Sequence, residues 1–364
     1  MSYKPDKPYN NLPLLPPDAV IETPAVLKMA ISANRVLGEL KGKSESLPNP
    51  EILINSIVLQ EARTSSEIEN VITTNDRLYT ALTASDAETD PHTREVLRYR
   101  EALKRGTSII REKPLSTNIF IGLMQIIKET DAGIRSQPGT VIANPKTRKI
   151  IYWPPEGEER IRQLLKNLED YIHENVTGHD PLIKMAVSHY QFEAIHPFDD
   201  GNGRTGRILN ILFLLEKGLL HQPVLYLSDH IIRNKSAYYR LLRDVTEKRQ
   251  WEPWILFMLE GVEKTSRRTM KRIDQILSLL DETIQTARSK LPARVYSKEL
   301  IELLFEQPYC KVKTLTDRGI AKRQTAAEYL RELESAGILK SKQVGRENLF
   351  INTTLYELLQ AIQN

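Results

Sequence analysis

The sequence has almost no cysteine and no long apolar segment. Its single cysteine, Cys310, has no partner for an intramolecular disulfide and leaves nothing for a multi-cysteine zinc site. No segment approaches the roughly 18 consecutive apolar residues of a membrane-spanning helix, and residues 1–18 lack the basic-then-apolar order of a signal peptide. We therefore expect a cytoplasmic protein, in which any bound metal is held by oxygen atoms.

The chain also lacks a strong excess of either charge. Its 51 Lys and Arg residues and 47 Asp and Glu residues leave a net charge of +4 over 364 residues. An excess this small does not indicate nucleic-acid binding by the whole molecule, so any such function must rest on a local cluster. Without acidic tracts or Gly/Ser stretches, the chain is expected to fold, and its length predicts two or three domains.

Helical periodicity covers most of the chain. Asp180 as N-cap and Pro181 as first helical residue predict a helix ending near Ile195. The segment from Arg204 onward is apolar on most sides and predicts a buried central helix. Residues 1–20 are expected to be extended on the surface. Further helices are predicted over residues 25–40, 51–63, 93–103, 116–130, 158–175, 235–246, 251–261 and 263–288.

Two places favour strands. Residues 140–143 and 150–153 are β-prone and flank NPKTRK, which predicts a hairpin. Near the C-terminus, helices are predicted over 298–306, 316–319 and 322–335, followed by two short strands around Gly345. Three helices followed by a hairpin predict a winged helix-turn-helix. The fold class is therefore mainly α: a helical bundle with a small hairpin, plus a small C-terminal winged helix-turn-helix.

The segment HPFDDGNGRTGR, residues 196–207, concentrates one histidine, two aspartates, three glycines and two arginines at a loop-to-helix junction. GNGRTG satisfies the GxGxxG pattern of dinucleotide-binding folds, but that motif follows a strand, whereas a helix precedes it here. The chain contains no GxxxxGK[ST] phosphate loop either. Both nucleotide-binding motifs are therefore rejected.

The same segment nevertheless has the chemistry of a phosphate site. Gly201 and Gly203 allow the backbone to approach a ligand, and the N–H groups at the start of the following helix can bind an anion. Arg204 and Arg207 are three residues apart and can reach the same region.

Residues at the other end of this segment can complete a reaction site. Asp199 or Asp200 can hold a Mg²⁺ ion that bridges phosphate oxygens. His196 is free to take a proton from a hydroxyl group.

HPFDDGNGRTGR resembles the HxFx[DE]GNGRxxR motif of the Fic family, enzymes of the AMP-transfer class, and the resemblance covers about residues 50–265. It implies a Fic-type helical bundle whose hairpin is a flap near residues 139–154. The chain then divides into an N-terminal helical region (1–92, with an inhibitory helix near 64–71), a catalytic core (93–288) and the winged helix-turn-helix (289–364).

The resemblance also implies roles for single residues. His196 would be the catalytic base and Asp200 the Mg²⁺ ligand, Phe198 would be a packing residue and Asp199 a solvated charge. Gly203 stands where phosphorylating relatives carry a larger basic residue, which favours AMP transfer. The residues expected to bind ATP are Gly201, Asn202, Gly203, Arg204, Thr205, Gly206, Arg207, Asn234 and Tyr239, with Tyr238 as a further candidate for the base pocket.

Residues 65–70, SSEIEN, resemble the family's inhibitory signature [ST]xxxE[GN]. This implies that Ser65 and Glu69 belong to an inhibitory helix and that Glu69 pairs with Arg207, which should hold the γ-phosphate. The same glutamate could instead position water for hydrolysis of an AMP-modified target. We keep both alternatives at this point.

The expected function is transfer of AMP from ATP to a Ser, Thr or Tyr hydroxyl of a target protein, or of the chain itself. The target would dock at the flap, which Arg135 and Gln137 precede, and a homodimer is compatible with the sequence. The competing interpretation is a nucleotide-sensing, DNA-binding regulator. It rests on basic residues of the C-terminal unit: Lys322, Arg323, Arg331, Lys340, Lys342 and Arg346.

Overall fold

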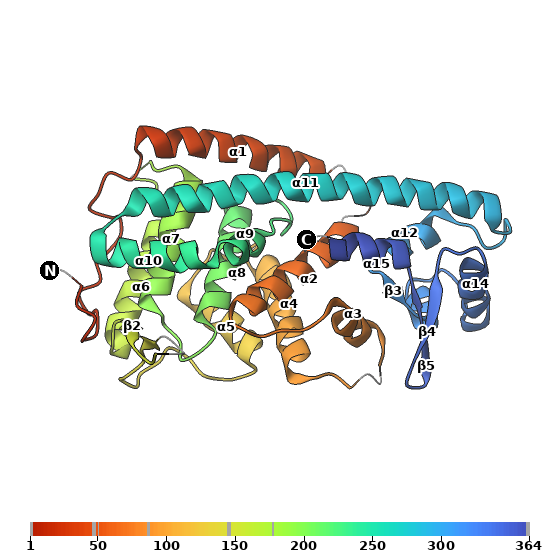
Figure 1. The fold of residues 1–364 in the computed structure, drawn as a ribbon, viewed down its shortest axis with the longest axis horizontal. Helices are drawn as coiled ribbons and strands as arrows, with labels where there is room; N and C mark the ends of the chain where they lie inside the picture. Colours follow the sequence, from red (N-terminus) through yellow and green to blue (C-terminus); the bar gives the residue numbers. More distant parts are fainter. Residues whose placement is uncertain are drawn as a thin grey trace.

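The computed structural model describes residues 3–45, 49, 51–85, 88–143, 147–176 and 178–361, apart from the side chain of Leu53. The molecule is elongated (Figure 1), with a helical core at one end and a small unit of helices and strands at the other. The long helix α11 (Trp251–Lys290) runs past both. Within the described residues, no helix has the length and apolar character needed to cross a membrane.

Helices begin where the capping residues in the sequence predict that they begin. The Asp180 side chain accepts a hydrogen bond from the backbone N–H of Leu182 (2.8 Å), with Pro181 as the first residue of α7 (Pro181–Ile195). Asp90 caps α4 (Pro91–Ile109) in the same way. The other helices of the core are α1 (Pro24–Glu45), α2 (Glu51–Ile68), α3 (Asn75–Thr83), α5 (Thr117–Lys128), α6 (Glu158–His173), α8 (Asn202–Glu216), α9 (Leu227–Arg233) and α10 (Lys235–Lys248).

Helices α7 and α8 form the centre of the core. Nearly every residue of both is buried, as predicted for the segment after Arg204. Around them, α6 packs on α7 and α5 on α8, while α2 packs on α4 and α9. The end of α7, the start of α8 and the loop between them therefore lie together at the centre of the core. Helices α2 and α5 both pack against α8.

Residues 3–20, the described part of this segment, contain no helix, in agreement with the expected extended segment. The segment is nevertheless anchored, because Leu12 and Leu15 are buried in the main core. The side chain of Asn167 in α6 bonds both the N–H (2.7 Å) and the carbonyl (2.9 Å) of Leu15.

The prediction of two helices over 251–261 and 263–288 is wrong, because α11 is continuous across Gly261. Glycine costs a helix only about 1 kcal/mol relative to alanine, and packing offsets that cost. A Cβ on Gly261 would lie 2.8 Å from the ring of His230, so this glycine allows α9 to pack closely on α11.

The predicted hairpin is present but short. β1 (Ile142–Ala143) pairs antiparallel with β2 (Ile150–Tyr152). Residues 144–146 of the predicted turn lie outside the described residues. Arg135 joins this region to the centre of the molecule, since its guanidinium donates to the carbonyl groups of Pro155, after the hairpin, and of His196.

The C-terminal unit contains three helices followed by a hairpin, as predicted: α12 (Lys298–Glu306), α13 (Val312–Asp317), α14 (Arg323–Ser335), β4 (Lys340–Val344) and β5 (Glu347–Ile351). The predicted position of the middle helix, 316–319, is wrong. Thr314 accepts the backbone N–H of Lys311 and starts α13 four residues earlier, and Gly319 (φ 69°) follows its end. Sequence reasoning also missed β3 (Tyr309–Cys310), which makes the sheet order β3-β5-β4, and α15 (Thr353–Gln360).

This unit is docked on α2 and α3. Tyr309 stacks on Tyr79 of α3 (5.6 Å between ring centroids), and its hydroxyl donates to Asp76 (2.6 Å). Lys342 of β4 pairs with the same carboxylate (2.8 Å). Helix α12 packs against α2. The C-terminal unit therefore contacts the helix that carries Ser65.

Candidate functional site

The loop between α7 and α8 is shaped by two left-handed residues. His196 (φ 50°) ends α7, and Gly201 (φ 85°) precedes α8. Only glycine adopts the second conformation without strain. A Cβ there would also lie 3.3 Å from the side chain of Lys128 in α5. The sequence HPFDDG thus forms a tight loop that ends directly at the start of α8.

The His196 imidazole is neutral near pH 7. Burial, and then the nearby Arg135 guanidinium, lower its pKa to about 4. Arg135 Nε donates to the His196 carbonyl (2.8 Å), which fixes the backbone. Among the described residues, Nδ1 of His196 has no hydrogen-bond partner. An uncharged imidazole on a fixed backbone can accept a proton from an incoming hydroxyl.

Asn202 holds the loop from inside. Its buried side chain accepts from the N–H of Phe198 (2.8 Å) and donates to the carbonyl of Phe198 (2.7 Å). Phe198 is buried beside Phe192, as expected for a packing residue. The Asn202 amide therefore bonds within the loop, and its backbone N–H, at the start of α8, is the group placed to contact an anion.

Asp200 and Arg204 belong to a cluster of four charges. Lys128 pairs with Glu95 (2.8 Å) and with Asp200 (2.6 Å), and Arg204 contacts the same two carboxylates. Burial opposes ionisation of both acids, but the hydrogen bond from Lys128 and the charges of Lys128 and Arg204 together keep the pKa of Glu95 and of Asp200 below the usual range. The Arg204 side chain is only 2% exposed, whereas that of Asp200 is 64% exposed.

The cluster defines what Asp200 can hold. No group of three or more His, Cys, Asp or Glu residues suited to a metal occurs in the described part of the chain. One exposed carboxylate fits Mg²⁺ only when substrate phosphates supply further oxygens, which is how proteins usually bind this ion.

Arg207 contacts both predicted inhibitory residues. Its Nε donates to Ser65 Oγ (2.7 Å), and Nη2 donates to the Ser65 carbonyl (2.9 Å) and to Glu69 Oε1 (2.9 Å). Burial disfavours its charge, but the Glu69 carboxylate, together with Tyr238, Glu193 and Tyr99, outweighs that effect, so that the pKa of Arg207 is raised. Arg207 is 2% exposed and Glu69 34%. Residues at the end of α2 therefore bond the Arg207 guanidinium, the group that the family resemblance assigns to phosphate binding.

A cleft of about 420 Å³ opens beside this pair. The hairpin (Ile142, Ala143, Ile151), α7 (Glu193) and α10 (Lys235, Tyr239) line it together with Glu69. Tyr239, predicted to contact the base, is 45% exposed here. The cleft thus brings together the hairpin, Glu69 and one residue predicted to bind the nucleotide, Tyr239.

Other predicted ligands lie apart from the cleft. Tyr238 is buried and bonded to His189 (2.8 Å), so it belongs to the core. Asn234 donates to the His230 carbonyl at the end of α9 and does not line the cleft in the described structure. Thr205 is fully buried, and Gly206 packs against α7, where a Cβ would fall within 3.0 Å of Glu193.

Sequence reasoning missed Glu95, Lys128 and Glu193. Glu193 stands out because burial raises its pKa to about 7 and because, in the described structure, its Oε1 has no hydrogen-bond partner. A carboxylate within the otherwise apolar segment FEAI, directly before His196, was the available signal for it. Glu95 and Lys128 lie on helical segments that carry several other charged residues. No local sequence pattern distinguishes these two from the other charges.

Three segments of the chain match known families. Residues 115–214 match the Fic/DOC family, residues 27–108 its N-terminal region (Fic/DOC family N-terminal), and residues 279–355 the C-terminal domain of SoFic-like protein adenylyltransferases. The chain belongs to the Fic/DOC family. The Fic match spans α7, the loop and most of α8, with the whole HPFDDGNGRTGR segment.

The Fic chain is similar to named adenylyltransferases over part of its length. It is 26% identical to the protein adenylyltransferase fic-1 of Caenorhabditis elegans over 39% of the chain and 27% of that protein. It is 32% identical to a probable protein adenylyltransferase of Aquifex aeolicus over 46% of the chain and 47% of that protein. The matches thus span from about a quarter to a half of these relatives.

Solved structures share the Fic fold. A Fic family protein from Desulfovibrio desulfuricans G20 matches with a TM-score of 0.60 at 18% identity, over 92% of this chain and 98% of that one. Fic-1 from C. elegans matches with a TM-score of 0.51 at 17% identity, over 69% and 75%. The predicted mainly helical Fic fold with a small hairpin and a small C-terminal sheet is confirmed.

Proposed function

We propose that this Fic protein is a protein adenylyltransferase that transfers AMP from ATP to a Ser, Thr or Tyr hydroxyl of a target protein, the chain itself being one acceptor. The observation that carries the proposal is the pairing of a neutral His196 with a helix start able to bind phosphate, in one loop. The named relatives are adenylyltransferases, which supports the same reaction class.

In the proposed reaction, His196 accepts the proton of the hydroxyl as its oxygen attacks the α-phosphorus. The bond from the α-phosphorus to the oxygen bridging to the β-phosphate breaks, and pyrophosphate leaves. The backbone N–H groups of residues 201–203 stabilise the charge that develops on the phosphoryl oxygens. Asp200 would hold Mg²⁺, which supplies charge neutralisation on the phosphates when bound.

We further propose that Glu69 restrains this activity. Its carboxylate occupies Arg207 (2.9 Å), the group assigned to the γ-phosphate. A charge-assisted hydrogen bond to a buried arginine stabilises the closed arrangement by roughly 1.5–3 kcal/mol. Since ATP must displace it to bind productively, basal transfer should be slower by about ten- to a hundredfold.

The flap would bind an extended target segment. In the part of the chain that the structure describes, β1 and β2 form a two-stranded sheet, and a peptide can add to its edge by main-chain hydrogen bonds. The acceptor hydroxyl would then lie over the cleft that the hairpin lines with Glu69 and Tyr239.

The test is transfer of label from ATP in the presence of Mg²⁺, with α- and γ-labelled ATP compared for the wild type, Glu69→Gly and His196→Ala. We expect label on protein from the α position only, increased about ten- to a hundredfold in Glu69→Gly and abolished in His196→Ala. Glu67→Gly is the matched control, because it places the same glycine in α2 but Glu67 pairs with Arg63.

Each other outcome is informative. Label from the γ position only would mean phosphorylation instead of AMP transfer. Equal activity of Glu69→Gly and the wild type would remove Glu69 as an inhibitor. Faster loss of AMP from labelled protein in the wild type than in Glu69→Gly would favour the hydrolase alternative.

A further inference from the structure

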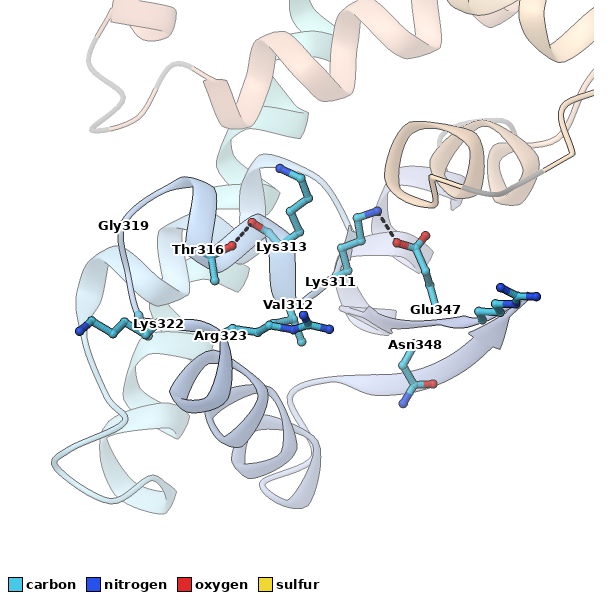
Figure 2. A pocket seen from close by; sticks show the side chains of 11 residues that line it. Lys311, Val312, Lys313, Thr316, Gly319, Lys322, Arg323, Glu347 and Asn348 are labelled. Carbon is cyan, nitrogen blue, oxygen red and sulfur yellow. Dashed lines mark hydrogen bonds and ion pairs between the residues drawn. The ribbon is translucent and has the colours of Figure 1, made fainter.

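The C-terminal unit contains a groove lined by cations. Its volume is about 990 Å³, and it lies between α13, the start of α14 and the β4–β5 turn (Figure 2). One carboxylate, Glu347, lines it. The cationic residues that line it are Lys311, Lys313, Lys322, Arg323 and Arg346.

Three of these cations are available to a ligand. Lys311 is bonded to Glu347 (2.7 Å) and Lys313 to Asp317 (2.7 Å). Lys322, Arg323 and Arg346 are exposed, and none of them forms an ion pair within the described residues. Figure 2 shows Lys322 and Arg323 leaving the start of α14 in opposite directions, so their charges spread along the groove.

The acidic side chains nearby are used elsewhere. Glu328 and Glu332 of α14 face Arg294 (3.6 and 3.5 Å), and Glu334 accepts the backbone N–H of Ser341 (2.8 Å). These contacts keep the carboxylates of α14 away from the groove, which therefore has a net positive charge.

The shape of the unit favours duplex DNA among polyanions. Ala326, Leu330 and Leu333 form the buried face of α14, which leaves Arg323, Gln324 and Arg331 exposed. In a helix-turn-helix the second helix enters the major groove, which in B-DNA is about 12 Å wide and admits a helix. The deep, narrow major groove of A-form RNA does not.

The position of the unit leaves this face open. Helix α14 lies at the end of the molecule remote from the hairpin (Figure 1). The core contacts this unit through Tyr309 and Lys342, which bond Asp76. At one edge of the groove, Lys311 and Glu347 also bond Ser85 (2.7 and 2.6 Å). None of these contacts uses Lys322, Arg323 or Arg346. We propose that this groove binds the phosphate backbone of duplex DNA, with Lys322, Arg323 and Arg346 as the phosphate contacts.

Fluorescence anisotropy of a labelled 20-base-pair duplex, titrated with the full chain, tests the proposal. About three phosphate contacts predict a slope of roughly −2.7 for log K against log salt, so that affinity should fall about 40-fold from 50 to 200 mM salt. Lys322→Ala/Arg323→Ala/Arg346→Ala should weaken binding at 50 mM at least about tenfold and flatten the slope.

The matched control is Arg162→Ala/Arg267→Ala/Lys298→Ala, which removes the same charges from exposed ion pairs outside the groove. It should bind like the wild type. Lys322→Glu alone, at an exposed position, repeats the test without a triple change.

Three results would overturn the proposal. The first is equal loss of binding in the groove variant and in the control. The second is binding of polyglutamate as tight as that of the duplex, which would indicate an acidic protein partner. The third is tighter binding of duplex RNA than of duplex DNA.

Discussion

Gly203 is the residue at which the proposed phosphate-binding turn meets the proposed inhibitory contact. It lies in the first turn of α8, and a Cβ there would fall within 3.0 Å of Glu69 Oε1 and 3.0 Å from Arg207 Nη1. The absence of a side chain at 203 therefore leaves the space that the Glu69 carboxylate fills. A larger residue would conflict with that carboxylate.

Because of this conflict, the effect of Gly203→Ala on stability should have opposite signs in the wild type and in Glu69→Gly. Gly203→Ala should lower the free energy of unfolding in the wild type, because the methyl group displaces Glu69. In Glu69→Gly it should raise stability, because alanine is about 1 kcal/mol better than glycine in a helix. Urea denaturation of the four proteins measures the coupling, expected at about 1 kcal/mol or more. The same sign in both backgrounds would contradict the assignment.

The pKa of His196 predicts the acid side of the pH–rate profile. Burial and Arg135 lower this pKa to about 4, and a general base acts only when deprotonated. Transfer by Glu69→Gly, measured as kcat/KM for ATP, should therefore stay constant from pH 8 down to about 6 and decline only at lower pH. A midpoint near 6.5, the value of an unperturbed histidine, would show that the imidazole is exposed in the working enzyme.

At the scale of elements, α2 is held in place by a buried carboxyl group. Glu61 accepts hydrogen bonds from the N–H (3.1 Å) and the hydroxyl of Ser228 in α9 and from Tyr99 of α4 (3.3 Å). Burial raises its pKa to about 7, against the hydrogen bonds from Ser228, which lower it. Ser65, one turn further along α2, and Glu69, just beyond the end of the helix, contact Arg207.

The raised pKa makes the contribution of Glu61 to stability depend on pH. A carboxyl whose pKa is higher folded than unfolded stabilises the fold below the unfolded value, about 4.5, and loses that contribution as pH rises through 7. Glutamine does not titrate. The stability of Glu61→Gln relative to the wild type should therefore increase from pH 4.5 to 7.5, as followed by urea denaturation. A difference that is constant with pH would contradict a raised pKa.

The sequence predicted long, well-capped elements and missed those fixed by distant contacts. Asp180-Pro181 located α7 to the residue, because an N-cap and a first-turn proline are local signals. The two-residue strand β3 exists only because it pairs with β5, more than 35 residues away. Gly261 suggested a helix end, and only the packing of α9 against it shows why the helix continues.

The candidate site divides in the same way. His196 and the glycines were predictable because the whole loop is one contiguous segment. The Glu69–Arg207 pair followed from a resemblance, since 138 residues separate the two. Glu95 and Lys128 were not predictable, because each is one charge among many on a helix and gains its meaning from Asp200 and Arg204.

At the scale of the whole molecule, Asp76 holds the C-terminal unit on the core. It accepts from Tyr309 (2.6 Å) and Lys342 (2.8 Å). Asp76→Ala should cost about 1–2 kcal/mol and allow the unit to open more often, because both donors lose their acceptor. Limited trypsin digestion should then cut faster near Arg294, between α11 and α12. Asp317→Ala is the control, because its partner Lys313 lies within the unit. Equal cleavage of both variants would contradict this role.

The unbroken course of α11 has a consequence for how a target is found. Forty residues at 1.5 Å each make a rod of about 60 Å, which runs past both the Fic core and the C-terminal unit. A flexible tether would let the flap search a volume around whatever the distal unit holds and would raise the local concentration of every protein within it. A rigid helix instead fixes the distance between the flap and whatever the C-terminal unit holds. Proteins positioned at that distance and on that side would be modified, and nearer ones would be passed over.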